Sequence, residues 1–255
     1  MKIATWNVNS LKVRLPQVLD WVATAQPDIL CLQETKLTDE NFPAEDIRAA
    51  GYHVVYSGQK TYNGVAILSR EEADAIITDI PGLDDPQRRI LGASIGGVRI
   101  LNLYVVNGEA VGSVKYDYKL HWLGRVAEHI RAQLETHSRF IALGDFNIAP
   151  EDRDVHDPEA WRERILCSTP EREALQKILD LGLADVFRRF EQEEQSFSWW
   201  DYRAAAFRRN MGLRIDLILA SRALAEKCTA CTIDKGPRRL ERPSDHTPVV
   251  AEFSR

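Results

Sequence analysis

The sequence lacks the features of several large protein classes. Its 255 residues contain no apolar run near the roughly eighteen residues that a membrane helix needs, no internal repeat and no low-complexity segment. The first residues, Met1 to Asn7, alternate like a strand and do not form the basic and then apolar pattern of a secretory signal. We therefore expect a globular protein of the cytoplasm, with no membrane association.

Cysteine is scarce and poorly placed for a metal or disulfide site. Four cysteines occur, and Cys228 and Cys231 form the one C-x-x-C pair. No second pair or histidine cluster completes a four-ligand zinc set. The segment is strand-like, so residues three apart lie about 10 Å from each other, which is beyond disulfide reach. We interpret both residues as structural thiols.

Basic residues are outnumbered, with 33 Lys and Arg against 38 Asp and Glu, and the net charge is −5. This balance is not that of a general nucleic-acid binder, so a DNA-binding protein of this composition must gather its basic side chains on one face. The hydrophobic share of 44% is enough for a sizeable core, and we expect one domain over residues 1–255.

Hydrophobic periodicity predicts an α/β protein. The Gly96-Gly97 pair suits a tight hairpin, and residues 150–168 are predicted as a loop region. Because strands joined by hairpins are mixed with helices, we expect largely antiparallel or mixed sheets packed in layers. The predicted strands are 2–6, 28–32, 52–57, 64–69, 90–95, 98–105, 140–143, 214–220, 228–234 and 247–253, and the predicted helices are a segment from Ser10 to before Pro27, 44–50, 115–137 and 170–181.

Polar residues stand where the apolar strand patterns stop. Taken singly, each has a structural explanation, such as a cap, a solvated strand end or an Asx turn. Asp216 is the hardest to explain in this way, since it interrupts an apolar run from Leu213 to Leu219 and a buried carboxylate needs a partner. The set comprises Asn7, Glu34, Asp145, Asn147, Asp216, Asp245 and His246.

The stretches around these residues occur in a characteristic order. They are Thr5-Trp6-Asn7-Val8-Asn9, Leu32-Gln33-Glu34-Thr35-Lys36, Gly144-Asp145-Phe146-Asn147-Ile148, Leu213-Arg214-Ile215-Asp216 and Pro243-Ser244-Asp245-His246-Thr247-Pro248. Together they resemble the exonuclease III family of abasic-site endonucleases, within the endonuclease/exonuclease/phosphatase superfamily that includes DNase I. The resemblance covers essentially the whole chain. It implies a four-layer α/β sandwich, with two packed mixed or antiparallel sheets flanked by helices.

The resemblance also implies a function. The protein would be a DNA-repair phosphodiesterase that cuts the backbone 5′ to abasic sites and removes 3′-blocking groups, and 3′→5′ exonuclease activity on duplex DNA stays open. Its partner would be double-stranded DNA with abasic sites or damaged 3′ ends, bound by a monomer. Mg²⁺ would be the cofactor, with Mn²⁺ as a substitute, because a hard cation suits oxygen ligands and phosphate. By resemblance, Glu34 is the main metal ligand, Asn7 lies close to it, and Asp245 adds to the metal shell.

Hydrolysis of a negative phosphodiester needs charge neutralisation, an activated water and a stabilised leaving oxygen. By resemblance, Asp145 orients or deprotonates the water and Asn147 holds Asp145 and the phosphate in place. His246 binds a phosphate oxygen and is oriented by Asp216, while Tyr104 contacts the phosphate or helps the leaving group. The number of metals and the identity of the general base stay open.

Further residues would recognise damaged DNA. An apolar pocket can accept a bare abasic sugar and exclude an intact base by size. By resemblance, Trp199, Leu213 and Ile215 line this pocket, although Leu213 and Ile215 suit the core equally well. Basic residues that would contact the DNA backbone are Lys36, Lys60, Lys115, Lys119, Arg203, Arg208, Arg209 and Arg214.

Two stretches depart from the family pattern, Tyr104-Val105-Val106-Asn107 and Leu166-Cys167-Ser168-Thr169-Pro170. Both would lie near the DNA or the abasic sugar, so the balance among the three nuclease activities stays open. A sphingomyelinase-like or inositol-phosphate-cleaving enzyme of the same superfamily is one alternative. A non-catalytic binding module is another, although every expected catalytic position carries the functional residue type.

Overall fold

A computed structural model describes residues 1–254 as two six-stranded mixed sheets with helices outside them. The first sheet contains β1 (Lys2–Asn7), β2 (Ile29–Gln33), β3 (His53–Ser57), β4 (Val65–Ser69), β13 (Cys228–Ile233) and β14 (Val249–Phe253). Its strand order is β13-β14-β1-β2-β4-β3. The β1–β2 pair is parallel, and the other pairs are antiparallel.

The second sheet repeats this mixture of pairings. It contains β5 (Asp74–Ile77), β6 (Ile90–Ile95), β7 (Val98–Tyr104), β8 (Phe140–Asp145), β9 (Leu183–Asp185) and β12 (Asp216–Ser221). Its order is β5-β6-β7-β8-β12-β9, and only β7 and β8 are parallel among the pairs of this sheet. A separate antiparallel ribbon is formed by β10 (Trp199–Trp200) and β11 (Gly212–Leu213).

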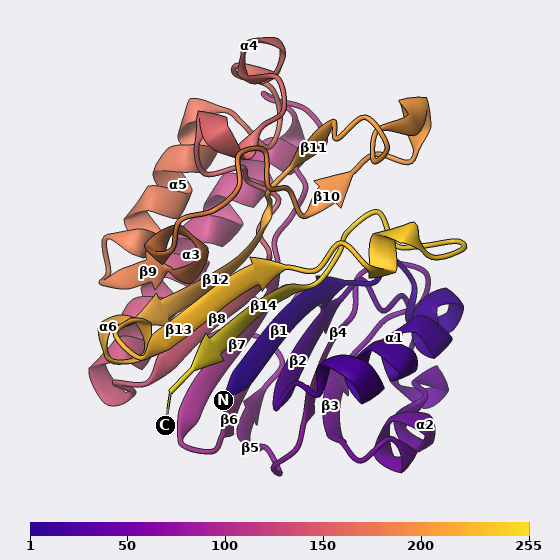
Figure 1. Ribbon diagram of the computed structural model, residues 1–255. Coiled ribbons are helices and arrows are strands. Elements are labelled where there is room, and N and C mark those ends of the chain that lie inside the picture. The colour runs from indigo at the N-terminus through magenta and orange to yellow at the C-terminus, as the bar shows by residue number, and fades with distance from the viewer. Residues whose placement is uncertain (255) are drawn as a thin grey trace.

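Helices cover the outer faces of both sheets (Figure 1). The larger helices are α1 (Leu11–Ala25), α2 (Ala44–Ala49), α3 (Val114–Thr136) and α5 (Thr169–Leu179), and the shorter ones are α4 (Pro158–Trp161) and α6 (Arg222–Ala225). Single turns of 3₁₀-helix occur at Asp39–Asn41, Asp152–Asp154, Val186–Arg189, Arg203–Ala205 and Pro237–Arg239. Figure 1 shows α1 and α2 on one side of the sandwich and α3 and α5 on the other.

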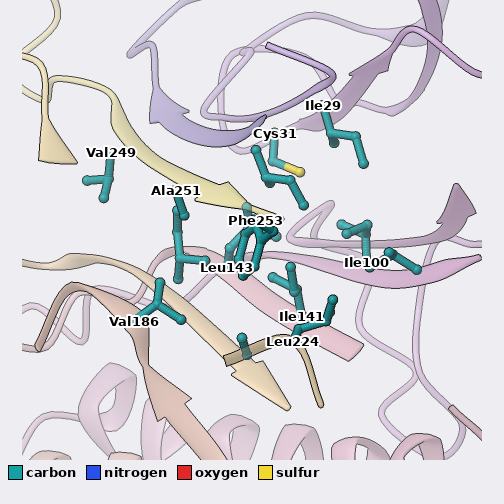
Figure 2. Packing of buried hydrophobic residues seen from close by; sticks show 14 of the residues in the cluster. Ile29, Cys31, Ile100, Ile141, Leu143, Val186, Leu224, Val249, Ala251 and Phe253 are labelled. Atoms are coloured by element: carbon teal, nitrogen blue, oxygen red, sulfur yellow. The ribbon is translucent and has the colours of Figure 1, made fainter. Parts of the chain in front are cut away.

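Three apolar layers hold this arrangement together. The layer between the sheets includes Ile29 and Cys31 from β2 and Ile141 and Leu143 from β8, all of them buried (Figure 2). A second layer joins the second sheet to α3 and α5, and a third joins the first sheet to α1 and α2. Helix, sheet, sheet and helix therefore form four layers, because each sheet buries both of its faces.

Local sequence signals set where the main helices begin and end. Ser113 caps α3, and its Oγ accepts a hydrogen bond from the amide of Tyr116 at 3.1 Å. Ser168 and Glu171 form a capping box at the start of α5. The last residue of α1 is followed by Gln26 in the left-handed conformation and then by Pro27.

The parallel strand pairs place several polar residues at one edge of the sandwich. The carboxyl ends of β1 and β2 lie together, as do those of β7 and β8, because paired parallel strands end on the same side. Asp216 opens the antiparallel strand β12 directly opposite Asp145, which ends β8. Tyr104 at the end of β7 pairs with the same Asp145. This edge carries the candidate site.

The four-layer α/β sandwich that the family resemblance implies is confirmed, and the Gly96-Gly97 hairpin joins β6 to β7 as expected. Short elements were not predicted: β5, β9, β10, β11 and α6 lie outside the predicted segments, and α4 lies within the predicted loop 150–168. Cys228 and Cys231 are free thiols. Among residues 1–254, no helix combines the length and apolarity that crossing a membrane requires.

Candidate active site

A compact group of ionisable side chains marks the site at the strand ends. One ligand atom each from Glu34, Asp145 and His246 lies within 4.8 Å of the other two. Asp145 and His246 are buried, and 17% of the Glu34 side chain is exposed. Glu34 and Asn147 have φ angles of 52° and 48°, which few residues other than glycine adopt. Such backbone strain is commonly held at functional sites, where the surrounding structure fixes it.

Asn7 joins the two carboxylates of this group across the two sheets. Its Nδ2 donates to Glu34 Oε1 and to Asp145 Oδ2, both at 2.9 Å. Its Oδ1 accepts from the amide of Asn9 at 3.0 Å, so the carboxamide is held at both ends. Asn7 comes from the first sheet and Asp145 from the second, and their contact therefore sets the position of the sheets at the site.

A second pair, His246 and Asp216, lies beside Asp145. His246 Nδ1 is 2.8 Å from Asp216 Oδ2, and Ser198 Oγ donates to the same oxygen at 2.7 Å. The other ring nitrogen, Nε2, is 3.6 Å from Asp145 Oδ2. Burial lowers the pKa of His246, but the charges of Asp216 and Asp145 outweigh burial and raise it to about 10. The imidazole is therefore cationic at neutral pH.

The environment of Asp145 favours proton exchange near neutral pH. Burial raises its pKa, the positive charge of His246 opposes this, and the net pKa is about 7. Asn147 holds the carboxylate by donating its backbone amide to Oδ1 at 2.9 Å. The Asn147 carboxamide donates to Val105 O at 3.0 Å and accepts from Asn107 Nδ2 at 3.2 Å. Asp145 is thus a fixed group with a pKa suited to general base catalysis.

Tyr104 completes this edge of the site. Burial raises the pKa of its phenol, and the carboxylates of Glu34 and Asp145 raise it further. The guanidinium of Arg89 lies 4.6 Å from the centre of the Tyr104 ring. The phenol is therefore a neutral donor at physiological pH.

The donor set fits a hard divalent cation. Glu34 and Asp145 bring two carboxylates close together, and Asp216 Oδ1 is buried without a hydrogen-bond partner. Close carboxylates repel each other, and a cation that prefers oxygen ligands removes this repulsion. The group contains one histidine and no thiolate, which differs from the cysteine and histidine sets of structural zinc sites.

Asp245 lies outside this compact group and accepts two hydrogen bonds. Asn9 Nδ2 donates to its Oδ1 and Trp199 Nε1 donates to its Oδ2, both at 3.0 Å. Asn9 Oδ1 in turn accepts from Lys36 Nζ at 2.6 Å. Asp245 therefore connects the metal side of the site to Trp199.

An apolar cluster lies behind Trp199, where the sequence predicts the abasic pocket. Leu213 and Ile215 are fully buried in it, while Trp199 is half-buried against it. Leu166 packs into the same cluster with a φ of 73°. The two aliphatic residues contribute to the floor of this region from the core, whereas Trp199, like Trp161 and Ile165, is only partly buried.

Two of the basic residues that the sequence assigns to the DNA face are placed elsewhere. Lys119 is fully buried, as is Arg214, which pairs with Asp154 and Asp185. Both side chains are held inside the protein by buried carboxylates, Lys119 by Glu171 and Arg214 by Asp154, so their assignment to backbone contact was wrong. The remaining residues lie at least partly in solvent: Lys36 is half-buried, and Lys60, Lys115, Arg203, Arg208 and Arg209 are exposed.

Sequence reasoning missed the roles of three polar residues. Ser198 anchors Asp216, Ser244 Oγ donates to Asn7 O at 2.7 Å, and Asn107 holds Asn147. Ser198 and Ser244 stand next to recognised motif residues, and that adjacency was the available signal. Asn107 follows a strand by three residues, and only the fold brings it to Asn147.

Comparison with known proteins agrees with this geometry. A family model described as the endonuclease/exonuclease/phosphatase family matches residues 4–246. The exodeoxyribonuclease III of Haemophilus influenzae is 37% identical, and the alignment covers 99% of this chain and 100% of that protein.

Two solved structures cover 100% of this chain and of their own chains. One is the 3′ phosphatase NExo from Neisseria bound to a product DNA hairpin, with a TM-score of 0.98 and 51% identity. The other is an AP endonuclease from Archaeoglobus fulgidus, with a TM-score of 0.96 and 42% identity.

Proposed function

The chain belongs to the endonuclease/exonuclease/phosphatase family, and from this premise we propose that it hydrolyses DNA 5′ to abasic sites and removes 3′-blocking groups. The single observation that carries the proposal is the cluster of Glu34, Asp145 and His246, which combines a metal-type donor set, a base and a cation. The relatives described as a 3′ phosphatase and as an AP endonuclease support both branches of the activity.

Glu34 is the direct metal ligand of this proposal, with Asn7 beside it and Asp245 supporting the shell through Asn9. A bound Mg²⁺, for which Mn²⁺ can substitute, would neutralise phosphate charge and stabilise the developing oxyanion. A carboxylate such as that of Glu34 is the ligand type that such a hard cation takes, and Asn7 holds this carboxylate through its Nδ2.

Asp145 acts as the group that orients the attacking water and takes its proton. Its pKa of about 7 leaves a substantial fraction ionised at neutral pH and able to accept that proton. Asn147 keeps the carboxylate in place and offers its carboxamide to the phosphate. Ground-state geometry already fixes both groups, so little reorganisation accompanies the reaction.

His246 supplies positive charge to a phosphate oxygen. Its Nδ1 is engaged by Asp216, which leaves Nε2 as the donor toward the substrate. Tyr104 donates from a neutral phenol to the phosphate or to the leaving oxygen. Asp216 acts through His246. Its carboxylate contacts His246 Nδ1 and Ser198 Oγ, and neither contact involves Nε2, the nitrogen that faces the substrate.

Discrimination of damage is assigned to the apolar cluster around Trp199. The half-buried indole faces the site through its contact with Asp245, and Leu213 and Ile215 support it from the core. An abasic sugar would contact this apolar wall, whereas an intact base would exceed the available space. Lys36, Lys60, Lys115, Arg203, Arg208 and Arg209 would contact the backbone of duplex DNA. We further propose that residues 1–255 act as one catalytic domain and as a monomer.

A substrate panel tests this proposal against its rivals. The purified protein with Mg²⁺ is given a nicked duplex ending in a 3′-phosphate, sphingomyelin vesicles and inositol phosphates in parallel. We expect phosphate release from the DNA end and none from the lipid or the inositol phosphates. Turnover of the lipid or the sugar phosphate instead would assign the site to another branch of the superfamily. No turnover of any of the three would favour a binding module.

A further inference from the structure

Lys119 is a buried lysine that the mechanism does not use. It lies on α3, and its side chain is 0% exposed. Its Nζ donates to Glu171 Oε1 at 2.5 Å, to Asn147 O at 2.6 Å and to Asn107 O at 3.1 Å. These contacts engage all three hydrogens of the ammonium group.

Glu171 is equally buried and its two oxygens are also fully engaged. Besides Lys119, Oε1 accepts from the amide of Leu166 at 3.1 Å. Oε2 accepts from the amide of Ser168 at 3.1 Å and from its Oγ at 2.6 Å. The carboxylate therefore fixes the segment that carries Leu166 into the apolar cluster behind Trp199.

The ion pair joins three loops that surround the candidate site. One follows β7 and carries Asn107, the second follows β8 and carries Asn147, and the third precedes α5 and carries Leu166. The first loop lies directly on the lysine stem, since a Cβ added at Gly108 would stand 3.1 Å from Lys119 Cδ. No other ion pair among the described residues has both side chains 0% exposed.

The energetics point away from a purely stabilising role. Removing two charges from water costs several kcal/mol per ion, and a well-packed apolar pair of similar volume is commonly as stable. What an apolar pair does not provide is a donor for two loop carbonyls and an acceptor for the loop amides. The pair is therefore suited to fixing loop positions.

We propose that Lys119 and Glu171 are positioning residues for catalysis, which hold the Asn147 loop against Asp145 and the Leu166 loop against the pocket wall. This inference rests on the proposed function of the site. The Asn147 side chain has three contacts of its own, to Val105 O, Asp145 Oδ2 and Asn107 Nδ2. Lys119 holds the backbone carbonyls of Asn107 and Asn147. Loss of the lysine should therefore weaken all of these contacts together.

The test compares Lys119→Met with the double variant Lys119→Met/Glu171→Met. The single variant leaves a buried carboxylate without its cation and should lower the Tm. The double variant removes both charges and should regain most of that Tm. If positioning is the role, kcat on a duplex with an abasic analogue stays at least about tenfold below wild type in the double variant, since a misplacement of about 1 Å can slow a reaction about a hundredfold.

A measurement of DNA affinity distinguishes a positioning role from damage to the DNA-binding surface. We expect the Kd for the same duplex, measured in Ca²⁺ without turnover, to stay within about twofold of wild type. Arg125→Met is the matched control, because it removes a cation from a partly exposed ion pair on the same helix; its kcat should be unchanged.

Recovery of kcat together with Tm in the double variant would overturn the inference and leave the pair a structural role only. Failure of both variants to fold would do the same. If the wild-type protein does not cut DNA, the proposed function fails. The crystal structure of the double variant then tests the positioning role without an activity measurement. A displaced Asn147 carboxamide supports positioning, and an unmoved one contradicts it.

Discussion

At the scale of single residues, burial and charge oppose each other at Asp145 and at His246. Asp145 is buried deeply enough to raise its pKa, and the cationic His246 limits that rise to a value of about 7. Asp216 in turn keeps His246 charged. Removing one charge therefore changes the protonation of its neighbours as well as its own contact.

Asp145→Asn should abolish most turnover and leave DNA binding intact. The amide keeps the shape of the carboxylate but cannot accept a proton, and loss of a general base typically costs roughly 10²- to 10⁴-fold in rate. Single-turnover cleavage and a binding titration measure the two effects. Asp20→Asn, an exposed residue of α1, is the control. Near-normal cleavage by Asp145→Asn would remove this residue from the reaction.

The sequence allowed prediction of the residues at strand ends, for a physical reason. Asp216 interrupts an apolar run, so it needed a buried partner, and His246 is that partner. Lys119 could not be placed in the same way. Lysine is rarely buried, and only the fold brings Glu171 and two loop carbonyls around it.

At the scale of elements, long periodic segments were predicted well and short ones were not. The 23 residues of α3 show a helical repeat over several turns. In contrast, β10 and β11 have two residues each, which is too short for any period to appear. Their pairing depends on long-range contacts, such as the bridge between Trp199 and His246.

At the scale of elements, a substitution at Gly144 tests how β8 positions Asp145 in the site. Its φ is 142°, and an added Cβ would stand 1.9 Å from Leu103 O on the neighbouring strand β7. Gly144→Ala should therefore destabilise the protein by about 2 kcal/mol or more. It should also slow cleavage, because the added methyl group pushes apart β7 and β8, which carry Tyr104 and Asp145. Denaturant unfolding and kcat measure both effects.

Gly124→Ala is the matched control for this substitution. Gly124 lies in α3, where an added Cβ meets nothing within 4 Å. The alanine should stabilise the helix by about 0.5–1 kcal/mol and leave kcat unchanged. Equal stability of the Gly144 and Gly124 variants would show that the β7–β8 contact does not fix the site.

At the scale of the whole molecule, a net charge of −5 must coexist with DNA binding. The exposed arginines Arg203, Arg208 and Arg209 lie on the segment that follows β10, next to Trp199. If these arginines contact DNA as proposed, the acidic remainder should repel DNA elsewhere and confine binding to this side. We therefore expect the charge distribution, rather than the total, to determine the binding face.

DNA affinity should consequently fall steeply as the salt concentration rises, because a small number of phosphate contacts provides the binding. The double variant Arg208→Gln/Arg209→Gln should reduce the slope of log affinity against log salt by up to about 2, since each phosphate contact contributes about 0.9. Arg131→Gln/Lys177→Gln removes the same charge from the exposed faces of α3 and α5. An equal change in slope for both double variants would contradict a localised DNA face.

The most direct test of the central claim uses one labelled duplex that contains a single tetrahydrofuran abasic analogue, incubated with Mg²⁺ or with EDTA. The analogue resists lyase chemistry, so a cut reports hydrolysis. We expect one nick immediately 5′ to the analogue in Mg²⁺, no nick in EDTA and none in an undamaged duplex. An intact abasic duplex in Mg²⁺, or equal cutting in EDTA, would contradict the central claim.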